Sequence, residues 1–249
     1  MNKTIGIFGG GQLGRMMAQA ALPLNIQCSF FEAETDCPAA ILGPVFSSKN
    51  PEALQDFIAS ADVFSLEFEN TPVEDVDVLT QTKTLHPPRV ALATAQNRLS
   101  EKALFDELTI PVAPYRAVDS LESLKKAVAE LGLPIVLKTA TGGYDGKGQF
   151  VLRSEDQIDT AWAELGPAKS LIAESFVKFS REVSIIAVRG QDGDVKTWAL
   201  AENHHHNGIL SHSIVPAPNS TDLQPVVQDY ITRLLNHLNY VGVLTLELF

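Results

Sequence analysis

The glycines of the segment Gly9-x-Gly11-x-x-Gly14 restrict the fold of this chain more than any other feature of its sequence. An apolar, β-rich run at residues 4–8 precedes them, and a helical pattern at residues 12–22 follows. A strand, a glycine-rich turn and a helix in this order begin a dinucleotide-binding fold, with Glu32 closing the next predicted strand. Two interpretations stay open: the turn binds NAD, or its glycines allow close strand–helix packing while the helix start binds another anion.

Short apolar runs alternate with helical patterns through the first part of the chain. Gln27–Phe31 and Val63–Phe68 are predicted strands, and Pro51–Ser60 is a predicted helix with Asn50 as its N-cap. Such alternation predicts a parallel, doubly wound sheet. Prolines at positions 87 and 88 interrupt the pattern, so we predict a Rossmann-like domain over residues 1–95.

Residues 96–249 have the pattern of an α+β domain with an antiparallel sheet. Helices are expected at about Thr94–Glu107, Ser154–Leu165 and Leu223–Leu238, and Ser120 is the expected N-cap of a further helix. The predicted strands are Leu133–Lys138, Gly148–Leu152, Leu171–Glu174, Glu182–Arg189, Lys196–Glu202, Ile209–Val215 and Val241–Phe249. The last strand ends without a cap or turn, from which we expect a C-terminally truncated chain.

Composition and charge narrow the class of protein. Hydrophobic residues make up 45% of the 249 positions and charged residues 20%, so the chain can bury a core and is not of the disordered class. The formal charge of −11 disfavours a nucleic-acid-binding surface. Apolar runs fall short of the roughly 18 residues of a membrane span, and Arg15 interrupts the signal-like start. With two cysteines, Cys28 and Cys37, a reducing cytoplasm is the expected location.

The loop at residues 139–149 is the most informative segment. Between two predicted strands, residues 142–148 contain four glycines, a tyrosine, an aspartate and a lysine. Such a hairpin can fold over a polyphosphate and direct backbone N–H groups at its oxygens. Lys138 and Lys147 would supply positive charge for those oxygens. The alternative is a flexible β-hairpin, which does not need these three side chains between its glycines.

Carboxylates and histidines further along the chain are weaker signals. Glu174 ends a predicted strand and Glu182 begins the next, where such groups can accept hydrogen bonds from adenine and ribose. The histidines at positions 204–206 alternate between strand faces, so they cannot close around one metal ion, and His205 is the one expected to touch a ligand. Glu247 lies in an apolar strand, where we expect it to be buried and to bind a hard cation such as magnesium.

Six segments together resemble the ATP-grasp superfamily and, within it, the N(5)-carboxyaminoimidazole ribonucleotide synthetase family of bacterial purine biosynthesis. They are GGGQLGRM at the first turn, EFENTP from Glu67, QNRLSEK from Gln96, GGYDGKGQ from Gly142, ENHHHNGIL from Glu202, and the terminal VGVLTLELF. The resemblance implies a pre-ATP-grasp domain at residues 1–95 and an ATP-grasp domain at residues 96–249. Within the latter, a central lid part would span about residues 110–173 and the remainder residues 174–249.

The activity that this resemblance implies is that of an ATP-dependent ligase. ATP would phosphorylate bicarbonate to carboxyphosphate, and the amine of 5-aminoimidazole ribonucleotide (AIR) would then take up the carboxyl group. The products would be N(5)-carboxyaminoimidazole ribonucleotide, ADP and phosphate. Phosphoryl transfer needs lysines, a glycine cradle and magnesium, and a lid protects carboxyphosphate from water. ATP and Mg²⁺ are therefore the expected cofactors, and a homodimer is the expected assembly.

The same resemblance assigns roles to individual residues. The catalytic residues would be Tyr144, Asp145 and Lys147, and Asp145 would accept the proton of the AIR amine. The AIR side would be lined by Gln12, Glu69, Tyr144 and Asp145, and the first magnesium ligand would be Glu247. ATP would be held by Arg98, Lys138, Gly143, Tyr144, Asp145, Gly146, Lys147, Gly148, Gln149, Glu174, Ser175, Phe176, Val177, Glu182 and His205.

The sequence departs from the family pattern at its end. A second metal carboxylate and an arginine-bearing stretch that binds the substrate phosphate would follow Phe249, so we expect this chain by itself to be inactive. Three alternatives stay open. They are another ATP-grasp ligase such as the formate-dependent glycinamide ribonucleotide transformylase, a nicotinamide-dependent oxidoreductase, and a fragment that binds nucleotide without turnover.

Overall fold

The computed structural model describes residues 3–142, 148–168, 170–206 and 208–249. The chain divides into two compact units. The first consists of Met1–Ala93 with Leu238–Gly242, and the second of Thr94–His237 with Val243–Phe249.

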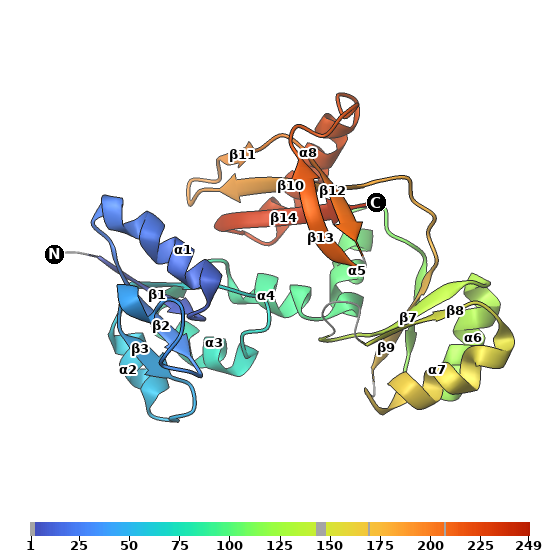
Figure 1. The fold of residues 1–249 in the computed structure, drawn as a ribbon, viewed down its shortest axis with the longest axis horizontal. Helices are drawn as coiled ribbons and strands as arrows, with labels where there is room; N and C mark the ends of the chain where they lie inside the picture. The colour runs from blue at the N-terminus through green and yellow to red at the C-terminus, as the bar shows by residue number, and fades with distance from the viewer. Residues whose placement is uncertain (1–2, 143–147, 169, 207) are drawn as a thin grey trace. The chain divides into compact units, whose positions relative to one another are not determined.

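A five-stranded parallel sheet forms the first unit, in the order β3-β2-β1-β4-β5. Figure 1 labels its strands β1, β2 and β3. The strands are β3 (Val45–Ser47), β2 (Gln27–Glu32), β1 (Thr4–Phe8), β4 (Val63–Leu66) and β5 (Thr84–Leu85). At the centre, Ile5 of β1 pairs with Cys28 on one side and with Val63 on the other. The chain order reverses at β1, which confirms the predicted doubly wound sheet. The short strands β3 and β5 were not predicted.

Helices pack on both faces of this sheet because successive strand residues point in opposite directions. Ile7 and Phe30 face the helix α1 and pack with its Ala18. Phe8 and Phe31 face the other way and pack with Phe57, whose ring stacks on that of Phe31 at 5.3 Å. The helices are α1 (Gln12–Ala21), α2 (Ala53–Ala59), α3 (Val73–Thr80) and α4 (Arg89–Ala95), with 3-10 turns η1 (Leu22–Leu24) and η2 (Ala40–Leu42).

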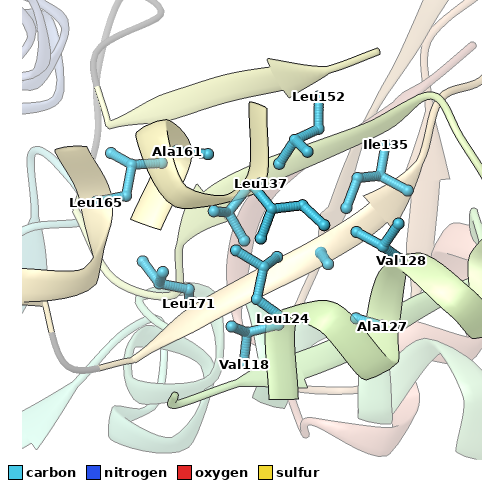
Figure 2. Close-up of a cluster of buried hydrophobic side chains, with 12 residues drawn as sticks. Val118, Leu124, Ala127, Val128, Ile135, Leu137, Leu152, Ala161, Leu165 and Leu171 are labelled. Carbon is cyan, nitrogen blue, oxygen red and sulfur yellow. The ribbon is translucent and has the colours of Figure 1, made fainter. Parts of the chain in front are cut away.

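A four-stranded antiparallel sheet opens the second unit, in the order β6-β9-β7-β8. Its strands are β6 (Tyr115–Val118), β9 (Leu171–Ser175), β7 (Ile135–Thr139) and β8 (Gln149–Leu152). The helices α6 (Leu121–Leu131) and α7 (Ile158–Leu165) cover one face, where Leu124, Leu137 and Leu165 belong to one apolar cluster (Figure 2). As predicted, Ser120 caps α6, because its Oγ accepts a hydrogen bond from the Ser123 N–H at 3.1 Å. The 3-10 turns are η3 (Glu155–Gln157) and η4 (Gly166–Ala168).

The second sheet of this unit has the order β11-β10-β12-β13, and β14 pairs with β10. Its strands are β10 (Glu182–Arg189), β11 (Val195–Thr197), β12 (Ala201–His206), β13 (Ile209–Ile214) and β14 (Gly242–Leu248). The helix α8 (Leu223–His237) lies between β13 and β14 in the chain. The predicted single strand at Lys196–Glu202 is therefore wrong. Gln224 of α8 binds the backbone between β11 and β12, accepting from the Leu200 N–H at 2.9 Å and donating to the Trp198 carbonyl at 3.2 Å, which interrupts the strand.

The predicted helix at Thr94–Glu107 is also divided. The helix α4 ends at Ala95, and α5 (Arg98–Glu107) begins after Asn97. The Asn97 side chain accepts hydrogen bonds from the N–H groups of Leu99 and Ser100, at 2.9 and 3.3 Å. Asparagine favours this capping position, with its extended backbone, over a helix interior, so it separates the two helices.

Candidate functional site

The glycine-rich loop leaves β7 and returns along β8. Lys138 pairs with Gln149 in the register of the two strands, and the Thr139 N–H donates to the Gly148 carbonyl at 2.9 Å. Gly142 and Gly148 have φ values of 67° and 72°, a left-handed conformation that glycine adopts without strain. The predicted residues Gly143, Tyr144, Asp145, Gly146 and Lys147 lie outside the described residues, so their roles stay predictions.

Arg98 holds the start of this loop. Its Nη1 donates hydrogen bonds to the carbonyls of Thr139 at 2.9 Å and Gly142 at 2.6 Å, and its backbone N–H donates to Ala140 at 2.8 Å. These bonds attach the first turn of α5 to the end of β7. Arg98 was predicted to contact ATP phosphates, and its anchoring of the loop places a guanidinium group at the loop entrance.

Glu174 is the centre of a buried charge cluster on the sheet face that lies opposite α6 and α7. Its side chain is 8% exposed, and its Oε2 lies 2.8 Å from the Nζ of Lys138. Its Oε1 lies 3.3 Å from the Nζ of Lys102, which reaches it from α5. Burial by itself would raise the pKa of Glu174, but the hydrogen bond from Lys138 and the charges of both lysines hold this pKa below its usual value. The carboxylate is therefore ionised and paired at neutral pH.

Lys102 and Glu101 complete this cluster, and the sequence interpretation assigned neither of them. Both lie in the QNRLSEK segment, and Lys102 follows Arg98 by one helical turn, on the same face of α5. Burial raises the pKa of Glu101, while Lys102 and Arg98 oppose that shift. The i, i+4 spacing of Arg98 and Lys102 is the sequence pattern from which two cations on one face of this helix could have been predicted.

The segment after β9 offers an apolar surface beside this cluster. The Ser175 N–H donates to the Pro114 carbonyl at 2.9 Å and the Phe176 N–H to the Pro134 carbonyl at 3.1 Å, so the backbone here is fixed. Phe176 and Val177 follow Glu174 closely and are each 36% exposed. Partly exposed apolar side chains next to a carboxylate suit a flat, partly polar ring such as a nucleobase.

Glu182 and His205 contact each other across β10 and β12, through the glutamate Oε2 and the imidazole Nδ1. Their side chains are 30% and 38% exposed. The neighbouring His204 points elsewhere: its ring stacks on that of His212 at 4.6 Å, and its Nε2 lies 3.3 Å from Glu202. His204 and His205 therefore have different partners, as the alternation of strand faces predicts.

Glu247 is exposed, and the expectation that it is buried is wrong. In β14 the alternation turns Leu246 into the core, while Val243 and Glu247 lie on the exposed face. The argument that a buried carboxylate needs a cation thus loses its premise. A carboxylate is still a suitable oxygen ligand for Mg²⁺, so the assignment of Glu247 as a metal ligand rests on the family resemblance.

The first glycine-rich turn, in the other unit, is occupied by the chain's own carboxylates. Glu67 accepts hydrogen bonds from the N–H groups of Gly11 at 2.7 Å and Leu13 at 3.1 Å. Glu32 accepts from the Gly10 N–H at 3.0 Å. A Cβ atom on Gly11 would overlap with the Glu67 side chain, so this glycine makes room for a carboxylate. Of the two interpretations of this turn, the structure matches close strand–helix packing with an anion at the helix start. That anion is the carboxylate of Glu67.

The predicted AIR residues Gln12 and Glu69 lie in the same unit as this turn. Gln12 is the first residue of α1 and is exposed, and Glu69 is exposed in the segment after β4. Their roles toward AIR stay predictions. In the described part of the chain, no helix is long and apolar enough to cross a membrane.

Two family models match the chain. The ribonucleotide synthetase preATP-grasp domain matches residues 1–96, and the ATP-grasp domain matches residues 103–249. A curated N5-carboxyaminoimidazole ribonucleotide synthase of Brucella melitensis is 43% identical over 251 residues, which cover 99% of this chain and 69% of the relative.

Solved structures of such enzymes have the same fold. An N5-carboxyaminoimidazole ribonucleotide synthetase of Thermus thermophilus is 41% identical with a TM-score of 0.92, over 98% of this chain and 67% of that one. An ADP complex of an N5-carboxyaminoimidazole ribonucleotide synthetase is 41% identical with a TM-score of 0.93, over 100% of this chain and 66% of that one. The chain thus spans about two thirds of the length of the proteins that it matches.

Proposed function

Because the chain belongs to the N5-carboxyaminoimidazole ribonucleotide synthase family of ATP-grasp ligases, we propose that it binds ATP at the Glu174 cluster for the carboxylation of AIR. The observation that supports this most is the pairing of the buried Glu174 with Lys138, beside the start of the glycine-rich loop. It offers a phosphate-binding ammonium group and a base-binding carboxylate in adjacent positions.

The reaction that we propose has two steps. A bicarbonate oxygen attacks the γ-phosphorus of ATP, and the bond to the leaving ADP oxygen breaks, which gives carboxyphosphate. The AIR amine then attacks the carboxyl carbon, phosphate leaves, and the nitrogen gives up a proton. Both steps depend on the positions of the reacting groups and on neutralisation of the negative charge of the phosphate oxygens. Lys138 and Arg98 would supply positive charge for this at the loop entrance.

Nucleotide recognition divides between two groups of side chains. Glu174, Ser175, Phe176 and Val177 would contact the adenine side. Glu182 would contact the ribose, and His205, beside it, would contact the nucleotide. Gly148 and Gln149 would close the loop over the phosphates. Magnesium, when bound, would neutralise charge on the phosphate oxygens, and the exposed carboxylate of Glu247 would be one of its ligands.

Roles in the AIR half of the reaction are assigned from the family motifs. Tyr144 and Asp145 would orient the AIR amine, Asp145 would accept its proton, and Lys147 would assist phosphoryl transfer. Gln12 and Glu69 would line the AIR side. We further propose domain bounds of 1–95 and 96–249 with a lid at about residues 110–173, a homodimer and a cytoplasmic location.

The test is a comparison of ligands by isothermal titration calorimetry. With Mg²⁺ present, we expect ADP to bind the purified chain and NADH not to bind. In thermal melts of the ADP-bound chain, AIR should add stability and glycinamide ribonucleotide should not. Stabilisation by glycinamide ribonucleotide alone would favour the transformylase, and binding of NADH in place of ADP would favour an oxidoreductase.

A further inference from the structure

Lys102 is a largely buried cation at the end of the QNRLSEK motif, to which the family resemblance assigned no role. Its side chain is 14% exposed, and its Nζ lies 3.3 Å from Glu174 Oε1. The same ammonium group lies 5.8 Å from the ring centroid of Tyr115, and the Tyr115 hydroxyl donates to Asp106 at 2.8 Å. A fixed aromatic ring on one side and a carboxylate on the other hold Lys102 in one place.

The two oxygens of Glu174 have different lysine partners. Oε2 is bound by Lys138 at 2.8 Å, and Oε1 is approached by Lys102 at 3.3 Å. Two ammonium groups thus share the Glu174 carboxylate, so this carboxylate keeps one cation beside it if the other lysine turns away. Glu101 of α5 is a second carboxylate close enough to interact with Glu174, and Tyr115 of β6 pairs with Glu174 in the strand register.

The two lysines differ in their freedom to move. Lys138 is 28% exposed and lies near the end of β7, where the glycine-rich loop begins, whereas Lys102 is half as exposed and lies against Tyr115. Lys138 is therefore the lysine that can turn toward a phosphate oxygen. If it does so without a second cation beside Glu174, a buried carboxylate is left unpaired, which is strongly unfavourable.

We propose that Lys102 is a positioning residue for nucleotide binding: it keeps Glu174 paired while Lys138 exchanges that carboxylate for a phosphate group. The exchange also frees Oε2 to accept a hydrogen bond from the amino group of the base. This inference rests on the proposed nucleotide site. It concerns a residue that acts through Glu174 and does not touch the reacting atoms.

A double-mutant cycle on the chain tests this role, with Mg-ADP affinity measured by calorimetry. Lys102→Met should weaken ADP binding about tenfold, which corresponds to about 1.4 kcal/mol. In a Glu174→Gln background the same substitution should change the affinity less than twofold, because the carboxylate that Lys102 serves is gone. Lys102→Arg should restore most of the affinity. Lys126→Met is the matched control, since Lys126 is 77% exposed on α6, and should leave ADP binding unchanged.

The outcomes separate this inference from the proposed function. If wild type binds ADP and Lys102→Met binds it equally tightly, the positioning role is wrong. An equal loss in the wild-type and Glu174→Gln backgrounds would show a purely structural role and would also overturn it. If Lys102→Met does not fold, a comparison of Lys102→Arg with Lys102→Gln tests the positioning role. The Lys102→Arg variant must then bind ADP several-fold more tightly than the Lys102→Gln variant, and equal affinities would overturn the role. Absence of ADP binding by the wild-type chain would refute the nucleotide site itself.

Discussion

Replacement of Glu67 by alanine is expected to destabilise the chain through the glycine-rich turn of its first unit. The substitution removes the acceptor for two N–H groups, those of Gly11 and Leu13. A hydrogen bond to a charged group contributes about 1.5–3 kcal/mol, and loss of a helix cap typically costs about 1 kcal/mol. Since Glu67 is only half-buried, water can replace part of the loss, and we expect a total of about 2–3 kcal/mol.

Thermal and urea unfolding of Glu67→Ala measure this effect. For a chain of this size, about 1 kcal/mol shifts Tm by roughly 2–4 °C, so the melting temperature should fall by about 5–10 °C. Glu164→Ala, which changes an exposed glutamate of α7, is the matched control and should shift Tm little. Gly11→Ala should destabilise wild type more than it destabilises Glu67→Ala, because its Cβ would overlap with the Glu67 side chain.

Two results would refute this account of the turn. If Glu67→Ala melts within about 1 °C of Glu164→Ala, which corresponds to less than about 0.5 kcal/mol, the carboxylate does not hold the helix start. If the effects of Gly11→Ala and Glu67→Ala simply add, the glycine is not there to make room for the carboxylate.

Four further outcomes are expected. Mg-ATP at about 100 times its Kd should stabilise wild type by about 2.7 kcal/mol, and thermal melts should show that Lys138→Ala loses most of this. In a catalytically active form of the enzyme, Asp145→Asn should lower AIR-dependent carboxylation by about 10²–10⁴-fold while bicarbonate-dependent ATPase activity survives better; an equal loss of both would contradict the proton-accepting role. Leu137→Ala should cost about 2–5 kcal/mol in urea unfolding, because Leu137 is fully buried, and a smaller loss would mean that the core of Figure 2 collapses around the gap. Burial raises the pKa of Tyr240 to about 12, so stability should fall as pH rises from about 10 to 12, and less so in Tyr240→Phe.

Much of the fold follows from local patterns that the sequence displays directly. The run before Gly9, the helical pattern after it and the cap at Ser120 all gave elements that the structure confirms. The errors lie where a side chain distant in sequence or a short polar cap interrupts an element. Gln224 separates β11 from β12, and Asn97 separates α4 from α5. Period and propensity carry no information about a glutamine that reaches back from a later helix.

Residues of the candidate site could be predicted only where they belong to a recognisable sequence motif. Glu174 and Lys138 were named as separate nucleotide residues, but their direct pairing depends on the register of β7 and β9 and was not foreseen. Lys102 was given no role from the sequence: its i, i+4 spacing from Arg98 indicates two cations on one face of α5, but its partner Glu174 lies on a strand distant in sequence. For Glu247, an apolar neighbourhood was taken as burial, whereas a strand with only one covered face exposes every second side chain.

The most direct test of the nucleotide site is a crystal structure of the chain grown with Mg-ADP. We expect the adenine ring against Phe176 and Val177, its amino group within hydrogen-bond distance of Glu174, and Lys138 turned from Glu174 to a phosphate oxygen. Lys102 should remain within about 3.5 Å of Glu174. Adenine bound at the turn of Gly9–Gly14, or ADP bound away from Glu174 with the Lys138 ion pair intact, would contradict the account.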